Sequence, residues 1–275
     1  TLQCGNNPPV TCPCMGTPGS AYCGTVSASN DVPFDAAGLQ TLADIVVQSG
    51  EMLVIDTQSG SWRTCDNRVV RSAGVGEVNN IGFAVTTGTA TKPGLGIFSF
   101  RSLTVQAGAT VVAVGATTPS EPHRHDNALV LLAGVEVSIQ GTLSVSAGPA
   151  SCSYDSACGI NSGNLLCAGS GGWQGGSVNE SGFGTGGGTN ILGDMSSGVP
   201  EGGGGGGGFG AAGGNGGGTW SGDCTMRPCG GGIYGYSTLE PLLGGSGGAG
   251  GGQAAPSAGI GGSGGGAVQI TAGSR

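Results

Sequence analysis

Charged side chains are scarce in this sequence, and basic ones are the scarcest. Asp, Glu, Lys and Arg make up 9% of the 275 residues, and Lys92 is the only lysine. An average domain is about 25% charged. The formal net charge is -8, so the chain has no basic stripe that could neutralise phosphates. The sequence therefore predicts no nucleic-acid partner.

The sequence also lacks long apolar runs and the short motifs of common enzyme classes. No stretch of 18 or more apolar residues occurs, which argues against a membrane-spanning helix. No G-x-S-x-G elbow, Walker loop or H-E-x-x-H motif is present, and the 16 acidic residues are scattered. We therefore predict a protein that is not an enzyme and binds no cofactor.

Histidine is rare, and both histidines stand in residues 123–126 (HRHD), close to Pro119 and Pro122. A zinc site needs three or four ligands at suitable spacing, and a third ligand is missing here. Because prolines favour turns, a solvated loop explains this stretch better. The sequence predicts no metal site.

Glycine, in contrast, is in great excess, with 64 of 275 residues against about 7% on average. Each interior glycine costs a helix about 1 kcal/mol relative to alanine, so helices are disfavoured along most of the chain. Glycine-rich sequences are often disordered linkers, but disordered chains tend to be highly charged. The low charge therefore favours an ordered glycine-rich structure.

Cysteine is also abundant, and its even count indicates disulfide bonds in an oxidising compartment. No C-x-x-C pair occurs, which argues against a metal centre. Five cysteines precede position 66 and five follow position 151, so at least one bridge must join the two groups if all are paired. We predict an extracellular or cell-surface protein with these disulfide cysteines: Cys4, Cys12, Cys14, Cys23, Cys65, Cys152, Cys158, Cys167, Cys224 and Cys229.

Residues 95–148 carry the alternation of apolar and polar side chains that is typical of half-buried β-strands. Leu103 and Val105 alternate with polar neighbours, and residues 135–139 repeat the pattern. The continuous apolar run at residues 127–133 (NALVLLA) predicts a strand that is buried on both faces or lies at a corner.

Internal similarity predicts how these strands stack. Residues 105–111 resemble residues 131–137 at an offset of 26, which is the size of one coil of a parallel β-helix. Residues 266–273 (GAVQITAG) look like a further coil after a long excursion. We therefore predict an all-β fold, a right-handed parallel β-helix or solenoid.

Residues 36–48 leave two interpretations open. Leu39, Leu42 and Ile45 recur at three-residue intervals, which predicts a short helix. The same stretch also suits the first coil of a solenoid. A strand over residues 52–55 is expected to follow.

The excursion repeats glycine with a period of three, as in residues 213–218 (GGNGGG), 244–252 and 261–266. A polyproline-II-type helix has three residues per turn, so such repeats leave two faces bare and let neighbouring segments approach closely. We predict a polyglycine-II bundle that packs on the solenoid. Aromatic residues are expected to cap its edges or to stack on sugars: Trp173, Trp220, Tyr234 and Tyr236.

These patterns divide the chain into four predicted parts. Residues 1–65 form a cysteine-rich N-terminal cap and first coil, and residues 66–148 form solenoid coils. Residues 149–266 form the glycine-rich polyglycine-II insertion, and residues 267–275 form a terminal strand. Residues 179–181 (NES) match the N-glycosylation sequon, so Asn179 is a candidate glycosylation site in an exposed loop.

Residues 98–105 (FSFRSLTV), 134–148 and 239–248 (LEPLLGGSGG), with the Cys- and Gly-rich block between them, resemble the glycine-rich secreted β-solenoid surface proteins of gliding bacteria. The similarity covers about residues 70–275. It implies a right-handed parallel β-helix with a glycine-rich insertion, exported to the cell surface and without catalytic residues. The glycine-rich block is also similar to the polyglycine-II tips of phage tail-fibre adhesins.

The sequence therefore favours a non-enzymatic extracellular structural protein, the protomer of a self-assembling surface filament or matrix. The absence of a signal peptide predicts a mature secreted chain, and Arg275 a processed end. An open solenoid end beyond Gly273 would then recruit the next protomer. The alternative is an adhesin that binds a glycan or receptor through loops of the glycine-rich bundle. A solenoid polysaccharide-degrading enzyme and an ice-binding protein are further hypotheses.

Overall fold

The chain is all-β in the residues described by the computed structural model, as the sequence predicts, and its sheets are not closed. The described residues are 30–89, 92–114, 127–147, 168–190, 203–217, 228–252 and 259–273, with the backbone of 14–15 and 22–23. The strands are β1 (Cys14–Met15), β2 (Tyr22–Cys23), β3 (Asp44–Val47), β4 (Met52–Asp56), β5 (Trp62–Thr64), β6 (Val69–Arg71), β7 (Gly76–Val78), β8 (Ile81–Val85), β9 (Leu95–Val105), β10 (Thr110–Val114), β11 (Ala128–Ile139), β12 (Thr142–Ser144) and β13 (Val268–Ala272).

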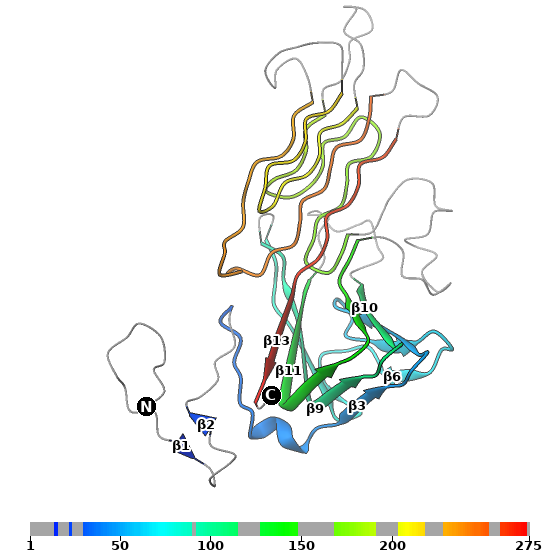
Figure 1. Ribbon diagram of the computed structural model, residues 1–275, viewed down its shortest axis with the longest axis vertical. Helices are drawn as coiled ribbons and strands as arrows, with labels where there is room; N and C mark the ends of the chain where they lie inside the picture. The colour runs from blue at the N-terminus through cyan, green and yellow to red at the C-terminus, as the bar shows by residue number, and fades with distance from the viewer. Residues whose placement is uncertain are drawn as a thin grey trace, which may run out of the picture.

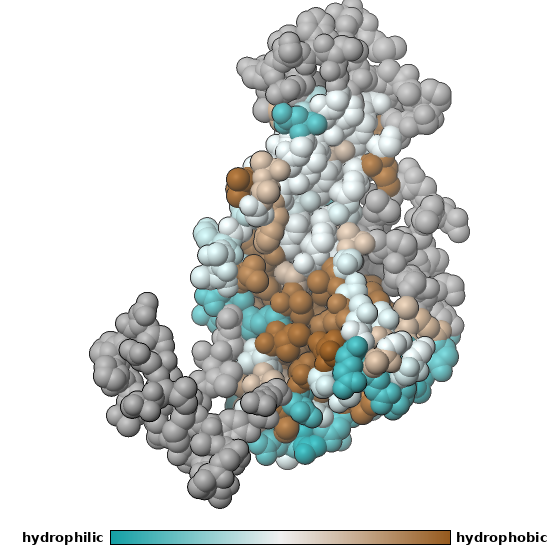
Figure 2. Space-filling model, viewed as in Figure 1, coloured by the Kyte–Doolittle hydropathy of each residue, from teal (hydrophilic) through white to brown (hydrophobic). Residues whose placement is uncertain are grey.

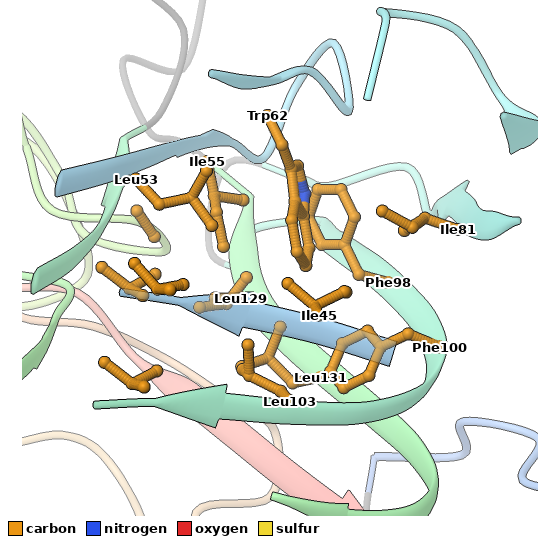
Figure 3. Close-up of a cluster of buried hydrophobic side chains, with 14 of the residues drawn as sticks. Ile45, Leu53, Ile55, Trp62, Ile81, Phe98, Phe100, Leu103, Leu129 and Leu131 are labelled. Atoms are coloured by element: carbon orange, nitrogen blue, oxygen red, sulfur yellow. The ribbon is translucent and has the colours of Figure 1, made fainter. Parts of the chain in front are cut away.

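Most of these strands form two sheets with the main hydrophobic core between them (Figure 1). One sheet has the order β12-β10-β4-β5-β6 and the other β13-β11-β9-β8-β7, with β3 also paired to β9. Leu53 and Ile55 of the first sheet share this core with Leu103 and Leu129 of the second (Figure 3). The ring of Trp62 lies 5.2 Å from that of Phe98. The short strands β1 and β2 form a separate antiparallel pair.

A strand–turn–strand unit recurs through both sheets in parallel register. The pairs β3–β4, β9–β10 and β11–β12 stack so that Val47 aligns with Val105 and Val105 with Ile139. Their turns also stack, because the Gly50 N–H donates to the Gly108 carbonyl at 3.2 Å. Both glycines have φ of 80°, a conformation that other residues rarely adopt. The turn glycines therefore keep successive units aligned.

The predicted 26-residue offset between coils is wrong. Val105 pairs with Ile139, whereas Leu131 pairs with Phe98, so the two similar segments occupy different places in the stack. The paired residues Val47 and Val105 are 58 positions apart (105 − 47), because strands β5 to β8 are inserted between the first and second units, whereas Val105 and Ile139 are 34 positions apart (139 − 105). Unequal insertions leave no single offset along the chain.

The other local predictions have clear outcomes. Residues 36–48 do not form an α-helix: a 3-10 turn at Gly38–Thr41 precedes β3, which pairs with β9. Ile45 and Val47 of β3 are buried and their neighbours exposed, so this stretch has the alternation of a strand. Strand β4 confirms the strand expected over residues 52–55. Strand β13 pairs with β11 and confirms the strand expected within residues 266–273.

Strand β11 is buried on both faces, as its apolar run predicts. Leu129 and Leu131 belong to the main core, while Val130 and Leu132 belong to a second cluster on the opposite face. Val32 completes that second cluster from the segment that precedes β3. Apolar residues gather on the lower half of the molecule in Figure 2, where the sheets lie in Figure 1. An outer layer of chain therefore covers the sheet next to β11.

Antiparallel strands cover the end of the stack that begins with β3 and β4. Strand β5 pairs antiparallel with β4, and β8 with β9. The side chain of Arg71 ties their loops together, since it is fully buried and lies 5.3 Å from the Phe83 ring centre. Its guanidinium donates to backbone carbonyls at 2.7–3.1 Å, namely those of Gly60, Ser72, Gly74, Gly76 and Ile81.

The described part of the glycine-rich region contains extended segments and no regular strands before β13. Residues 168–190, 203–217, 228–252 and 259–267 lie side by side above the sheets (Figure 1) and exchange backbone hydrogen bonds. The last segment leads directly into β13, which joins this region to the sheet.

Candidate functional site

Most of the residues predicted to carry chemistry lie outside the described part of the chain. This is true of residues 123–126, which hold both histidines, and of six of the ten cysteines. Cys14 and Cys23 are described as backbone only, whereas the side chains of Cys65 and Cys229 are described. Within the described residues, no group of three or more His, Cys, Asp or Glu could hold a metal ion.

Asn179, the candidate glycosylation site, lies in a tight turn with φ of 64° and is half-buried. Its N–H donates to the Gly251 carbonyl at 3.0 Å, and the Glu180 carboxylate accepts a bond from the Ser177 N–H at 3.0 Å. The turn therefore belongs to the glycine-rich region. Glycosylation at this residue stays a prediction.

An apolar cavity of about 660 Å³ lies between residues 32–39 and strands β8, β9 and β11. A smaller cavity of about 220 Å³ lies beside β3 and β4 and includes Glu51 and Arg68. Among the described residues, no histidine or cysteine lines either cavity. Neither arrangement resembles a nucleophile with its base. The residues that form the apolar cavity wall are Val32, Phe34, Leu39, Phe83, Ile97 and Leu132.

The ionisable side chains around β3 form surface pairs. The Ser102 hydroxyl donates to the Asp44 carboxylate, and Arg101 Nη1 lies 2.5 Å from the same group. The Ser102 hydrogen bond, assisted by Arg101, holds the pKa of Asp44 below its usual value. Glu51 and Arg68 form a second ion pair. Because each acid has its own partner, these groups fit a structural role.

The backbone of residues 244–251 bonds to three neighbouring segments in rotation. Every third N–H group donates to the same neighbour. The N–H groups of residues 245, 248 and 251 donate to carbonyls of residues 259–265, and those of residues 246 and 249 donate to carbonyls of residues 205–208. The N–H groups of residues 244, 247 and 250 donate to carbonyls of residues 171–183. These bonds are 2.7–3.3 Å long. A period of three matches the three residues per turn of a polyproline-II-type conformation.

Along residues 259–265, side chains are excluded from the positions of Gly261 and Gly264, where neighbouring segments touch. A Cβ atom on Gly261 or Gly264 would lie 1.9 or 1.8 Å from a backbone carbonyl oxygen, a distance that real side chains do not reach. In contrast, a Cβ atom on Gly259, Gly262 or Gly265 would meet nothing within 4 Å. These three residues are exposed, so one side of the segment is bare.

The segment of residues 211–217 carries a second bare row. Gly214 and Gly217 are exposed, and a Cβ atom on either would meet nothing within 4 Å. We call these two rows the bare glycine columns, one of Gly259, Gly262 and Gly265 and one of Gly214 and Gly217. Within the described residues, none of their N–H groups donates a hydrogen bond. The columns therefore combine free donors with the absence of side chains.

Aromatic side chains close the end of the glycine-rich region nearest the sheets. Trp173 is fully buried, and its ring meets Tyr234 edge-on at 5.9 Å. Phe209 meets Tyr234 at 5.2 Å. Burial raises the pKa of the Tyr234 phenol, whose hydroxyl donates to the Gly244 carbonyl at 2.7 Å. Trp173 and Tyr234 therefore pack within the protein, in line with the predicted capping role.

Comparison with known proteins leaves the chain without a demonstrated relative. No protein-family model, curated protein or solved structure matches it significantly. The described residues include no helix of the length and apolar character needed to cross a bilayer.

Sequence reasoning missed the bare glycine columns, although their signal is present in the chain. Gly259, Gly262 and Gly265 stand three residues apart, as do Gly214 and Gly217. The triplet rhythm predicts rows of glycine, but all glycines in it look alike. Only the positions of the neighbouring segments distinguish a bare row from a buried one.

Proposed function

We propose that this protein is a non-enzymatic structural protein of the cell surface or extracellular space. Copies of the chain associate with one another into a filament or matrix. The fold proposed for it is a right-handed parallel β-solenoid that carries a polyglycine-II bundle and is stapled by disulfides. Kinship with the glycine-rich surface proteins of gliding bacteria is part of the same proposal.

Two sets of contacts support the proposed architecture. The stacked units β3–β4, β9–β10 and β11–β12, with their aligned turn glycines, are what a solenoid requires. The threefold rotation of hydrogen bonds around residues 244–251 is what a polyglycine-II bundle requires.

Disulfide stapling is supported by the two cysteines whose side chains are described. Cys65 and Cys229 are each disulfide-bonded. Ordering glycine costs more conformational entropy than ordering any other residue, and a disulfide lowers that cost by restricting the unfolded chain. An oxidising, extracellular location is therefore part of the proposal.

The observation that carries the proposal of self-association is the pair of bare glycine columns. Gly262 and Gly265 are exposed residues at a spacing of three, and within the described residues their backbone N–H groups donate no hydrogen bond and a Cβ atom on either would meet nothing within 4 Å. Inside the protein, the same kind of surface already binds another segment, since the N–H of Gly264 donates to Trp173 and that of Gly261 to Gly176. A segment from a second copy would extend this pattern by one row.

The experiment that tests the proposal places a large side chain in each column. The column variant, Gly262→Arg with Gly214→Arg, has free space at both sites, so its fold should be retained. The matched control is Gly232→Arg, because Gly232 is also exposed with nothing within 4 Å but belongs to neither column. Negative-stain electron microscopy should show fibres or sheets for the control and shorter assemblies for the column variant. Equal assembly by both proteins would refute the role of the columns.

One observation favours the adhesin as the second candidate function. Ile233, Tyr236 and Leu239 are large apolar residues of one loop and are 69%, 64% and 48% exposed. An exposed aromatic ring beside apolar side chains offers a stacking surface for a sugar. Binding to a glycan array that is lost in Tyr236→Ala but kept in Ile139→Ala would support this function. A protein that binds no glycan would remove it.

A further inference from the structure

The interior of the strand stack is covered at one end and uncovered at the other. Val47, Val105 and Ile139 occupy the same position in successive units. Their exposed fractions are 2%, 0% and 37%. Ile139 thus has the position of a core residue, yet it is accessible because no described strand lies beyond the last unit.

The backbone of this last unit is paired on one side only among the described residues. Strand β11 pairs with β13 at residues 129–133, but its residues 136–139 pair with β9 alone. Strand β12 pairs with β10 alone. We call residues 136–144 the open edge. An unpaired strand edge is a template for a further strand.

The sequence of the open edge lacks the usual features that block strand association. Natural edge strands are often protected by lysine, proline or an inward-pointing charge. Residues 136–144 (EVSIQGTLS) contain no lysine and no proline, and Glu136 is their only charged residue. Glu136 is exposed, whereas Val137 and Leu143 pack against the main core. The open edge is therefore suited to pairing.

The opposite end of the stack shows which kind of strand fits. There, β5 pairs antiparallel with β4, and β8 pairs antiparallel with β9. In this fold an antiparallel strand can thus complete a sheet made of parallel strands. Antiparallel pairing is also the arrangement that two identical edges adopt about a two-fold axis.

We propose that the open edge binds the open edge of a second copy of this chain in antiparallel orientation. Centred on Ser138, the pairing places Val137 opposite Ile139 of the second copy. Glu136 then lies opposite Gln140 of the second copy, so no like charges face each other. The contact buries the exposed Ile139 in both copies.

This inference rests on the proposed self-association and adds a second surface to it. A two-fold contact closes on itself and yields only a dimer. A protein with the edge contact and a separate glycine-column contact can use both in alternation, so the assembly continues to grow. The edge contact alone would stop at a dimer, so an extended assembly also requires the glycine-column contact.

The test compares Ile139→Lys with Val46→Lys in the full chain. Val46 is a matched control, because it is 45% exposed but lies on β3 at the other end of the stack. A lysine at residue 139 would place a charge in the new interface and should raise the dimer dissociation constant more than about tenfold. Sedimentation velocity over a range of concentrations measures this. Equal association by the two variants overturns the inference.

Combining Ile139→Lys with the column variant separates the two proposals. If both surfaces act, each variant alone forms small assemblies and the combined variant is monomeric. If assembly is reduced in Ile139→Lys but not in the column variant, each compared with its own control, the edge contact is supported and the glycine-column contact is refuted. If assembly is reduced in the column variant but not in Ile139→Lys, the glycine-column contact is supported and the edge contact is refuted.

Amide hydrogen exchange of the unmodified protein tests the edge contact without any substitution, so the result does not depend on whether a variant folds. Amides of residues 136–144 should exchange more slowly as the protein concentration rises, because association pairs the edge. Amides of residues 52–56 in β4, paired on both sides within the chain, should not change. Exchange at residues 136–144 that is independent of concentration overturns the inference.

Discussion

A Cβ atom on Gly231 would lie 1.7 Å from the carbonyl oxygen of Gly186, whereas one on Gly232 would meet nothing within 4 Å. Two adjacent glycines thus differ completely in the room that they leave. The difference follows from the threefold packing, in which one residue in three faces outward.

Gly231→Ala should therefore unfold at a markedly lower temperature, because the new methyl group must push segments 228–234 and 182–190 apart. Gly232→Ala should be neutral or more stable by about 0.5 kcal/mol, because alanine restricts the unfolded chain more than glycine does. Differential scanning calorimetry of the two variants decides the matter. Equal melting temperatures would contradict the close packing of these segments.

Arg71→Lys should destabilise the protein although the charge is kept. Lysine cannot reproduce the fork that reaches the carbonyls of Gly60, Gly74 and Gly76, so these carbonyls lose their donor, and that of Gly60 is buried. The expected loss in the free energy of unfolding is about 3 kcal/mol. Arg63→Lys is the control, since Arg63 is exposed on the neighbouring strand. If urea denaturation gives the same midpoint for Arg71→Lys and Arg63→Lys, Arg71 does not hold the loops of the antiparallel strands together.

Acid should weaken the fold partly through Asp44. Its pKa is lowered in the folded protein, chiefly by the Ser102 hydrogen bond. The stabilisation is therefore present above the unfolded value of about 3.9 and is lost as the pH falls through the folded value. Half of the Asp44 side chain is exposed, so the effect is small. Melting temperatures between pH 2 and 7 should depend less on pH in Asp44→Asn than in Glu77→Gln.

Alkali should weaken the fold through Tyr234. Burial raises the pKa of its phenol, so the neutral form is favoured in the folded state and stability falls as the pH rises above about 10. Tyr234→Phe keeps the ring contacts with Trp173 and Phe209 but loses the hydroxyl bond to Gly244. It should cost about 1 kcal/mol at neutral pH and reduce the loss in alkali. Tyr236→Phe, at an exposed site, should change neither the stability at neutral pH nor its loss in alkali.

Some elements follow from short-range pattern. The apolar run of β11 and the alternation at Leu103 and Val105 predict strands because side chains in a strand alternate between its two faces. The strand β13 was predictable for the same reason. The 3-10 turn at Gly38–Thr41 was not, since three-residue spacing of leucines also occurs where a chain turns and then enters a strand.

The candidate site was less predictable than the fold. The glycine triplets indicate a period of three. They do not show that Gly262 has free space around it while Gly261 packs against a backbone carbonyl. The exposure of Ile139 is also invisible in the sequence, where it resembles the buried Val105. In both cases the environment depends on which segment lies next in space.

The sequence by itself determined an all-β chain, since glycine excess disfavours helices and alternation favours strands. It also determined the apolar core of β11 and the threefold rhythm of the glycine-rich region. Only the tertiary structure decided the register of the stacked units, the burial of Arg71 and the positions of the bare glycine columns. The physical reason is that each of these depends on contacts between residues far apart in the chain, and the insertions between them have unequal lengths.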